Sequence, residues 1–259
     1  MIIDSHCHLN HLKLEGIEGG LDAVIQNAKI AGVDKIISIC VELEENETLR
    51  GFSKRYENVF HSVGVHPSEW GGEQPDVARL VELSSNAKCV AIGETGLDYH
   101  YNDVLTIPAQ TEKFANHIQA SIQTQKPLII HTRAAKQNTL ELMKSESADN
   151  TCGVMHCFTE DWDMAKQSLD MGFYISFSGI VTFKNADDLR EVAKKMPLDR
   201  ILIETDAPYL TPAPFRGKPN YPEYVRFVAA FMADLKDLSL EEFSAITVQN
   251  TERLFSLTI

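Results

Sequence analysis

Two histidines separated by one residue stand near the start of the chain. His6 and His8 follow an apolar opening in the run MIIDSHCHL. Side chains two positions apart on a β-strand point to the same side, so a strand here would direct both imidazoles into one space. Imidazole is a common ligand of Zn, Mn, Fe and Ni. The pair therefore indicates half of a metal site, whereas Cys7 would face the opposite side and pack in the core.

Further metal-ligating side chains follow later apolar runs. Glu94, His131, His156 and Asp206 each stand at the end of a different run. A single histidine at the end of a run more often makes structural hydrogen bonds than binds a metal ion. Structural hydrogen bonds are a poor explanation when five different runs all end in possible ligands. Four histidines and two carboxylates match what two divalent ions need when one carboxylate bridges them. We therefore expect a binuclear metal centre.

The apolar runs recur along the whole chain. They cover residues 1–4, 35–41, 59–64, 89–93, 127–131, 153–156, 173–177 and 200–204. Apolar positions between them repeat at helical spacing, as at Leu21, Val24, Ile25 and Ala28 and again at Phe114, Ile118, Ala120 and Ile122. Two more helical segments are expected near 222–236 and 240–255. This alternation predicts parallel strands joined by helical crossovers.

The number of these units predicts the architecture. Eight strand–helix units in about 250 residues have the size and order of a (β/α)8 TIM barrel. A doubly wound open sheet is the alternative, because periodicity alone does not separate the two. Candidate ligands at the ends of many runs favour the barrel, where those ends converge on one mouth. We predict one α/β domain over residues 1–259, a TIM barrel with an extra C-terminal helix and a Pro-, Gly- and Lys/Arg-containing loop at 211–222 over its mouth.

Composition restricts the class of protein. Hydrophobic residues make up 44% of the chain, enough for a substantial core. No apolar run reaches the ~18 residues that span a membrane, and no basic segment precedes an apolar stretch at the start, so a cytoplasmic protein is expected. The five cysteines are widely spaced and form no CxxC pair, which predicts reduced thiols.

The net charge of −13 counts against a protein that coats nucleic acid, because such binding depends on Lys and Arg. It does not exclude an enzyme that grips one or two phosphates, since a metal pair adds about four positive charges locally. Nucleotide-binding motifs of the GxxxxGK[ST] or GxGxxG type are absent from the sequence. The acidic composition is compatible with a monomer.

Taken together, the motifs resemble those of the TatD-type deoxyribonuclease family, within the amidohydrolase-like TIM-barrel metal hydrolases. The resemblance covers essentially the full chain. Its blocks are DSHCHL at 4–9, GVHP at 64–67, GETGLDY at 93–99, HTR at 131–133, MHCF at 155–158 and ETDAPYLTP at 204–212. The segment RGKPN at 216–220 is similar to a loop of the family and departs from it at Lys218–Pro219.

The resemblance implies a role for each ligand. His6 and His8 would bind one metal ion and His131 and His156 the other, with Glu94 as the bridge. Asp206 would bind a metal ion and orient or deprotonate the attacking water, so Glu94 and Asp206 are the expected catalytic residues. The ions would be Mg, Mn or Zn.

Other residues are expected around these ligands. Asp4 and Glu204 each lie two residues before a ligand and are expected to support the ligands from behind. Arg133 is a candidate phosphate contact, because guanidinium pairs with two oxygens at once. Three further positions are less defined: His66 would meet a phosphate or shape its loop, Asp98 and Tyr99 would line the mouth or support it, and Arg216 would bind substrate.

The expected activity is hydrolysis of DNA phosphodiesters by a metal-activated water. The resemblance implies a 3′–5′ exonuclease that acts on single-stranded DNA or 3′ ends, with no membrane partner. Arg133 and the basic loop favour phosphorus as the electrophile. A metal-dependent esterase or amidase, such as a D-aminoacyl-tRNA deacylase, is the alternative, because related barrels cut carbon esters by the same water attack. A non-catalytic metal-binding protein would leave Asp206 unexplained.

Overall fold

The strands of the chain form one barrel. The computed structural model describes residues 1–100 and 106–257, and its eight-stranded sheet is parallel in chain order. The first and last strands meet where the backbone N–H of Asp206 donates to the carbonyl of His6 (2.9 Å) and that of His8 donates to Ala207 (2.8 Å). The strands are β1 (Ile2–Cys7), β2 (Val33–Ser38), β3 (Val59–Val63), β4 (Cys89–Asp98), β5 (Leu128–Arg133), β6 (Gly153–Met155), β7 (Tyr174–Phe177) and β8 (Ile201–Ile203). The nearly closed α/β barrel confirms the predicted TIM-barrel architecture, and the alternative prediction of a doubly wound open sheet is wrong.

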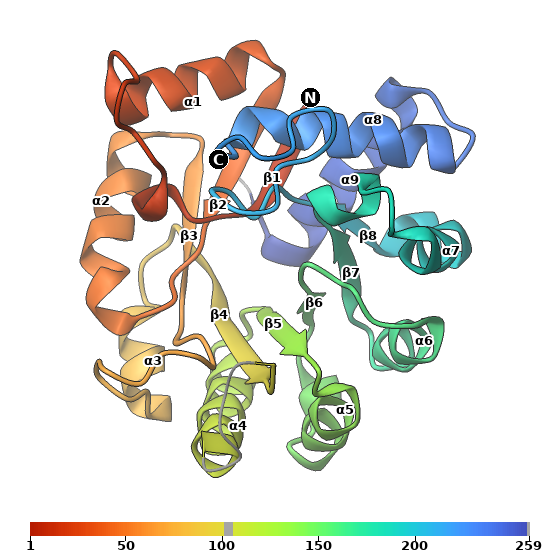
Figure 1. Cartoon of the computed structure of the whole chain (residues 1–259). Coiled ribbons are helices and arrows are strands. Elements are labelled where there is room, and N and C mark those ends of the chain that lie inside the picture. Colours follow the sequence, from red (N-terminus) through yellow and green to blue (C-terminus); the bar gives the residue numbers. More distant parts are fainter. Residues whose placement is uncertain (101–105, 258–259) are drawn as a thin grey trace.

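Helices surround the strands (Figure 1). They are α1 (Gly20–Ile30), α2 (Asn46–Arg55), α3 (Val77–Leu83), α4 (Ile107–Thr124), α5 (Lys136–Ser145), α6 (Trp162–Asp170), α7 (Asp187–Lys195), α8 (Val225–Leu235) and α9 (Leu240–Phe255). Local sequence explains several of their starts. Asp76 and Asp161 accept backbone N–H bonds at the starts of α3 and α6, and Ser239 with Glu242 forms a capping box at α9. No helix within the described residues is long and apolar enough to cross a lipid bilayer.

The apolar core has two layers. Alternate strand residues such as Ile37, Phe60 and Ile129 fill the inside of the barrel, while their neighbours face the helices. Leu254 and Phe255 of α9 belong to the inner layer, so the predicted extra C-terminal helix closes one end of the barrel. Cys7 is fully buried in the outer layer, as its position opposite His6 predicts.

Element boundaries differ most from the prediction where ligands lie. Strand β4 continues to Asp98, five residues beyond the predicted end of its run, and β1 reaches Cys7. His8 therefore lies one residue past the strand, at the start of the 3₁₀ helix η1 (Leu9–His11), rather than on it. The hydrogen bond from His8 to Ala207 turns the chain here and completes the barrel, a contact between distant segments that the local pattern does not contain.

Candidate metal centre

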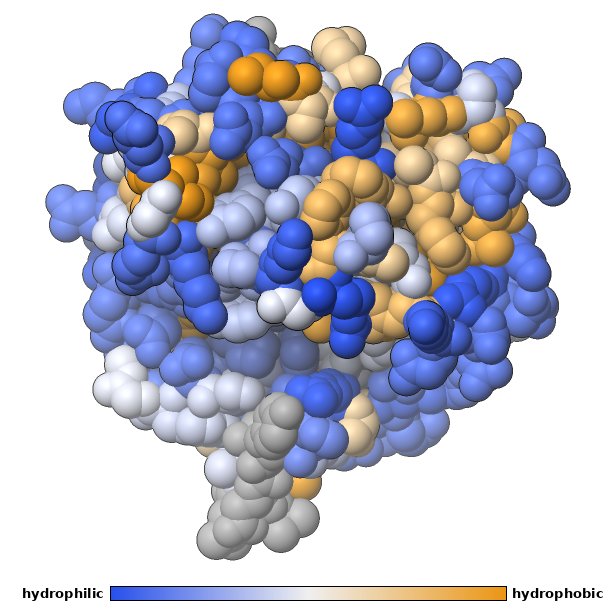
Figure 2. All heavy atoms as spheres, turned by 45° about the horizontal axis from the view of Figure 1, so that its top comes forward, coloured by the Kyte–Doolittle hydropathy of each residue, from blue (hydrophilic) through white to orange (hydrophobic). Residues whose placement is uncertain are grey.

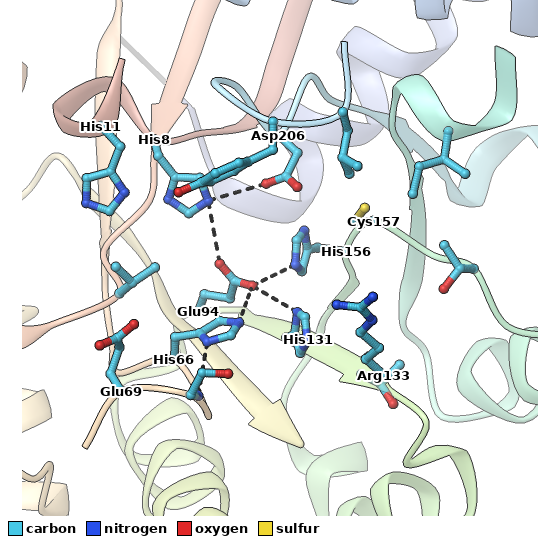
Figure 3. Close-up of a pocket in the computed structure, with 17 residues that line it drawn as sticks. His8, His11, His66, Glu69, Glu94, His131, Arg133, His156, Cys157 and Asp206 are labelled. Atoms are coloured by element: carbon cyan, nitrogen blue, oxygen red, sulfur yellow. Dashed lines mark hydrogen bonds and ion pairs between the residues drawn. The ribbon is translucent and has the colours of Figure 1, made fainter. Parts of the chain in front are cut away.

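A cavity of about 600 Å³ opens at the ends of the strands. Strands β4 and β5 and the segments that follow β1, β3, β6 and β8 supply its lining, which includes His8, His66, Glu94, His131, Arg133, His156 and Asp206. Figure 3 shows these groups directed toward one another across the opening. In barrels of this kind the carboxyl ends of the strands carry the chemistry. The structure therefore brings the predicted ligands together at one mouth.

Glu94 lies between the histidines, and each of its two carboxylate oxygens faces a different pair of them. Its Oε2 is 3.3 Å from Nε2 of His6 and 3.8 Å from Nε2 of His8. Its Oε1 is 2.8 Å from Nε2 of His156 and 3.2 Å from Nδ1 of His131. One carboxylate thus faces one histidine pair with each oxygen, an arrangement suited to a bridging ligand. Figure 3 shows Glu94 between His8 on one side and His131 and His156 on the other.

Asp206 faces the first histidine pair. Its Oδ1 is 3.3 Å from Nε2 of His8 and 3.6 Å from Nε2 of His6. Two ligands of a tetrahedral ion, each ~2.1 Å from it, are roughly 3.4 Å apart. The spacings around Glu94 and Asp206 are of this size, and the buried Nε2 of His156, although 2.8 Å from Oε1 of Glu94, is not aligned for a hydrogen bond with any described residue. The donor set therefore fits metal ions better than a network of hydrogen bonds.

Carboxylates also support two of the histidines from behind. Oδ2 of Asp98 lies 3.1 Å from Nε2 of His131, and Oε1 of Glu204 lies 3.1 Å from Nδ1 of His156. A carboxylate behind a ligating histidine orients the ring and makes it a stronger ligand. Glu204 stands where we expected it, and Asp98 supports a ligand rather than lining the mouth.

Asp4 has a different set of contacts. Its carboxylate accepts hydrogen bonds from the backbone N–H (2.9 Å) and the hydroxyl (2.6 Å) of Thr205. Burial raises the pKa of Asp4 to about 8, although these two hydrogen bonds act to lower it. The side chain thus holds the segment that carries Asp206, and it reaches His6 only through the backbone N–H at 3.4 Å.

The buried charges of the site stabilise one another. Burial alone would raise the pKa of Glu94, but the surrounding histidines, His156 above all, hold it well below its usual range. Burial would likewise lower the pKa of His156, yet Glu94 and Glu204 raise it well above the ordinary value. The lowered pKa values of Glu94 and Asp206 leave these carboxylates ionised and available as ligands. The raised pKa values of His8, His131 and His156 mean that these rings hold a proton more tightly than free imidazole, and a metal ion must displace it.

His66 lies beside this set. Its Nε2 is 3.5 Å from Oε1 of Glu94, and its Nδ1 accepts the backbone N–H of Ser68. Burial lowers the pKa of His66 to about 3, so the ring is neutral. With Nδ1 as the acceptor, Nε2 carries the proton and is a donor rather than a ligand. His66 thus faces the cavity as a hydrogen-bond donor and also shapes its loop.

The predicted substrate residues lie in two places. Arg133 is exposed and lines the cavity, extending alongside His131 (Figure 3). Arg216 does not line this cavity. It lies in a neighbouring groove together with Lys218, because the loop after β8 carries it past the mouth before the chain returns to α8.

Two cavity residues escape the sequence patterns. Nε2 of His11 lies 2.5 Å from Glu45, and its ring stacks on His8 with centroids 5.6 Å apart. Residues three apart in a 3₁₀ turn lie above one another, so η1 returns His11 to the site. Tyr209 also lines the cavity, with its ring edge toward His8. In the sequence, each of these two residues stands three positions after a predicted ligand. That spacing indicates a place in the site only when the conformation of the intervening turn is known.

Known proteins are similar to this chain in both sequence and fold. The profile of the family described as TatD related DNase matches residues 3–256. The chain belongs to this family. It is 44% identical over 256 residues to the Escherichia coli K12 protein named "Uncharacterized metal-dependent hydrolase YcfH", with 99% of this chain and 96% of that protein covered. It is 41% identical over 258 residues to "Uncharacterized metal-dependent hydrolase YabD" of Bacillus subtilis 168, with 99% and 100% covered.

Solved structures agree with this membership. The crystal structure of YjjV, a TatD homolog from Escherichia coli K12, superposes with a TM-score of 0.89 at 28% identity, covering 99% of this chain and 98% of that one. The TatD-family chain is therefore a metal-dependent hydrolase, and its His, Glu and Asp clusters suit a binuclear metal site.

Proposed function

We propose that this TatD-family hydrolase is a deoxyribonuclease that removes nucleotides from the 3′ end of single-stranded DNA. The observation that carries the proposal is the position of Glu94 between two histidine pairs. One of its oxygens faces His6 and His8 and the other faces His131 and His156, and Asp206 lies beside the first pair. Such a site is suited to attack by water on a phosphodiester. The family description, TatD related DNase, supports the same reaction.

The residues of the chain have separate tasks in this reaction. The residues that would hold two divalent ions are His6, His8, His131, His156, Glu94 and Asp206. When bound, a divalent pair lowers the pKa of water toward ~7 and neutralises charge that develops on phosphorus. Asp206 orients the attacking water and accepts its proton. Although burial opposes it, the hydrogen bond from His8 and the charge of His6 lower the pKa of Asp206, so the carboxylate is ionised at neutral pH.

Phosphate recognition is assigned to two side chains at the rim of the cavity. Arg133 offers a planar pair of donors that matches two phosphate oxygens. His66 directs its Nε2–H into the same cavity, beside Glu94. Both donors lie on the side of His131, and together they favour phosphorus over an uncharged carbonyl carbon as the electrophile.

The dimensions of the site favour a strand end. A cavity of about 600 Å³ is within the range of about 300–1,000 Å³ found for small-ligand pockets. It is suited to one terminal nucleotide rather than to a duplex lying across it. The net charge of −13 agrees with such a small contact area.

The test uses single-stranded and duplex DNA labelled at the 5′ end, incubated with protein loaded with Mg, Mn or Zn. We expect a ladder that shortens from the 3′ end on the single strand and is lost with chelator or in Asp206→Asn. Immediate release of the label as a mononucleotide, without a ladder, would reverse the polarity. If DNA and RNA both stay intact with every metal, the phosphodiesterase proposal is wrong, and D-aminoacyl-tRNA and small acyl esters become the substrates to assay.

A further inference from the structure

A second hollow lies directly beside the metal centre. This groove of about 410 Å³ shares Leu210 with the cavity of the metal centre. Its lining includes Lys13, Phe183, Arg216 and Lys218. Figure 2 views the mouth obliquely and shows a hollow with apolar surface and strongly hydrophilic side chains side by side at its border. The two hollows are therefore neighbours that one extended ligand could occupy.

The groove gathers positive charge on an acidic protein. Lys13, Arg216 and Lys218 are all exposed, and none of them forms an ion pair with a carboxylate of the described residues. The guanidinium of Arg216 instead lies 3.5 Å from the ring centroid of Phe183, and Nζ of Lys218 lies 5.6 Å from that of Phe215. Aromatic faces hold these cations without neutralising them. Three charges are thus available to an anion.

The loop that carries these cations is fixed to the metal centre by hydrogen bonds. The buried Asn220 donates to the carbonyls of Thr205 and Tyr209, and the hydroxyl of Thr211 donates to the carbonyl of Lys218. The 3₁₀ helix η5 (Gly179–Thr182) packs closely on the same loop, since a Cβ at Gly179 would lie 2.0 Å from the carbonyl oxygen of Leu210. Asp206 and the groove therefore keep a constant spacing.

Tyr209 stands between the two hollows. It lines the cavity of the metal centre, precedes the shared Leu210, and remains 54% exposed. Its ring meets His8 edge-on, with centroids 6.0 Å apart, so the ring is supported. An exposed aromatic ring beside cations is the arrangement on which unpaired bases stack in proteins that bind single strands.

We infer that the groove is a second binding site for a single-stranded polynucleotide, in which Lys13, Arg216 and Lys218 neutralise phosphates next to the scissile one and Tyr209 stacks on a base. The inference rests on the proposed nuclease function and adds to it a second subsite on the substrate strand. A strand longer than a dinucleotide reaches both hollows, whereas a mononucleotide fills only the first. Bases in a duplex are paired and stacked on both sides, so an internal duplex base does not reach Tyr209.

The test measures binding separately from cleavage. Fluorescein-labelled oligothymidylates, from the dinucleotide to the decanucleotide, are titrated with Asp206→Asn protein by anisotropy over a range of salt concentrations. Three further changes are compared in that background: Arg216→Gln with Lys218→Gln, Tyr209→Leu, and the matched control Lys29→Gln with Lys54→Gln. The control removes two exposed lysines, on α1 and α2, that line neither hollow.

We expect affinity to rise with length and to fall with salt. Each lost phosphate contact lowers the salt slope of a single strand by about 0.7, so Arg216→Gln with Lys218→Gln lowers it by about 1.4 while the control leaves it unchanged. Tyr209→Leu weakens long oligonucleotides about tenfold. An unchanged slope and length dependence in the groove variants, or equal binding of duplex and single strand, overturns the inference even if wild-type protein degrades DNA. If the groove variants lose salt slope and affinity as predicted but the wild-type protein cleaves no DNA, the groove is supported as a binding site and the nuclease proposal is wrong.

Discussion

Oδ2 of Asp98 lies 3.1 Å from Nε2 of His131, on the side of the ring opposite to Glu94. The neighbouring Gly96 makes this approach possible, since its φ is +137° and a Cβ there would lie 1.9 Å from the carbonyl oxygen of His131. Strands β4 and β5 thus pack closely enough for a carboxylate on one to support a ligand on the other. Glu204 supports His156 in the same way.

The first prediction concerns this support. Asp98→Asn should weaken binding of one metal ion by about 10–100-fold, because the amide no longer makes His131 a stronger ligand. Competition with a metal-binding dye measures the two affinities. Glu204→Gln is the matched variant at His156, and it should weaken one ion by a similar factor. Equal affinities in wild type and Asp98→Asn would assign Asp98 a structural role only.

Asp206→Asn should abolish turnover and leave metal content nearly unchanged. The amide keeps an oxygen beside His8 and His6 but does not accept the proton of the attacking water. A lost general base lowers the rate by about 10²–10⁴-fold. Rates on labelled DNA and metal content by mass spectrometry are measured on one preparation. Cleavage at the wild-type rate would show that another group takes the proton.

His131→Ala should lower the metal content from two ions to one per chain. His131 and His156 face the same oxygen of Glu94, so the remaining ion stays with His6 and His8. Elemental analysis after dialysis gives the stoichiometry. Lys29→Gln, at an exposed position on α1 that does not line the cavity, provides a control and should leave both ions in place. Two ions retained in His131→Ala would remove this residue from the ligand set.

His117 should contribute to acid sensitivity of the fold. Its Nε2 accepts the backbone N–H of Val65 at 3.0 Å, and burial lowers its pKa from 6.5 to about 4. The unfolded chain takes up a proton below pH ~6.5, while the folded chain does so only near the lowered pKa. The free energy of unfolding therefore falls as pH falls through this window, by at most about 1.4 kcal/mol per pH unit.

Urea denaturation at neutral pH and near pH ~5 measures this effect. His117→Gln keeps an acceptor for Val65 and has no proton to gain, so its stability should fall less over the same interval. If His117→Gln loses as much stability as wild type on acidification, the acid sensitivity arises elsewhere.

Local sequence patterns account for the elements and for the types of ligand. The eight apolar runs are all strands, and α9 begins and ends at the predicted residues. Strand periodicity and helix caps depend on neighbours along the chain, so they can be read from it. The parallel order then brings strand ends to one mouth, which is why separated residues such as Glu94 and His156 could be predicted to lie in one site.

The tertiary structure alone determined which atoms of these residues face one another. Which oxygen of Glu94 faces which histidine pair, the support of His131 by Asp98, and the position of Arg216 outside the metal cavity depend on strand register and loop path. The register of β4 on β5 shifts between Ile92 and Thr95, and that shift sets Asp98 beside His131. Such contacts join residues far apart in the chain, and their geometry follows from barrel closure and close packing, which no local pattern contains.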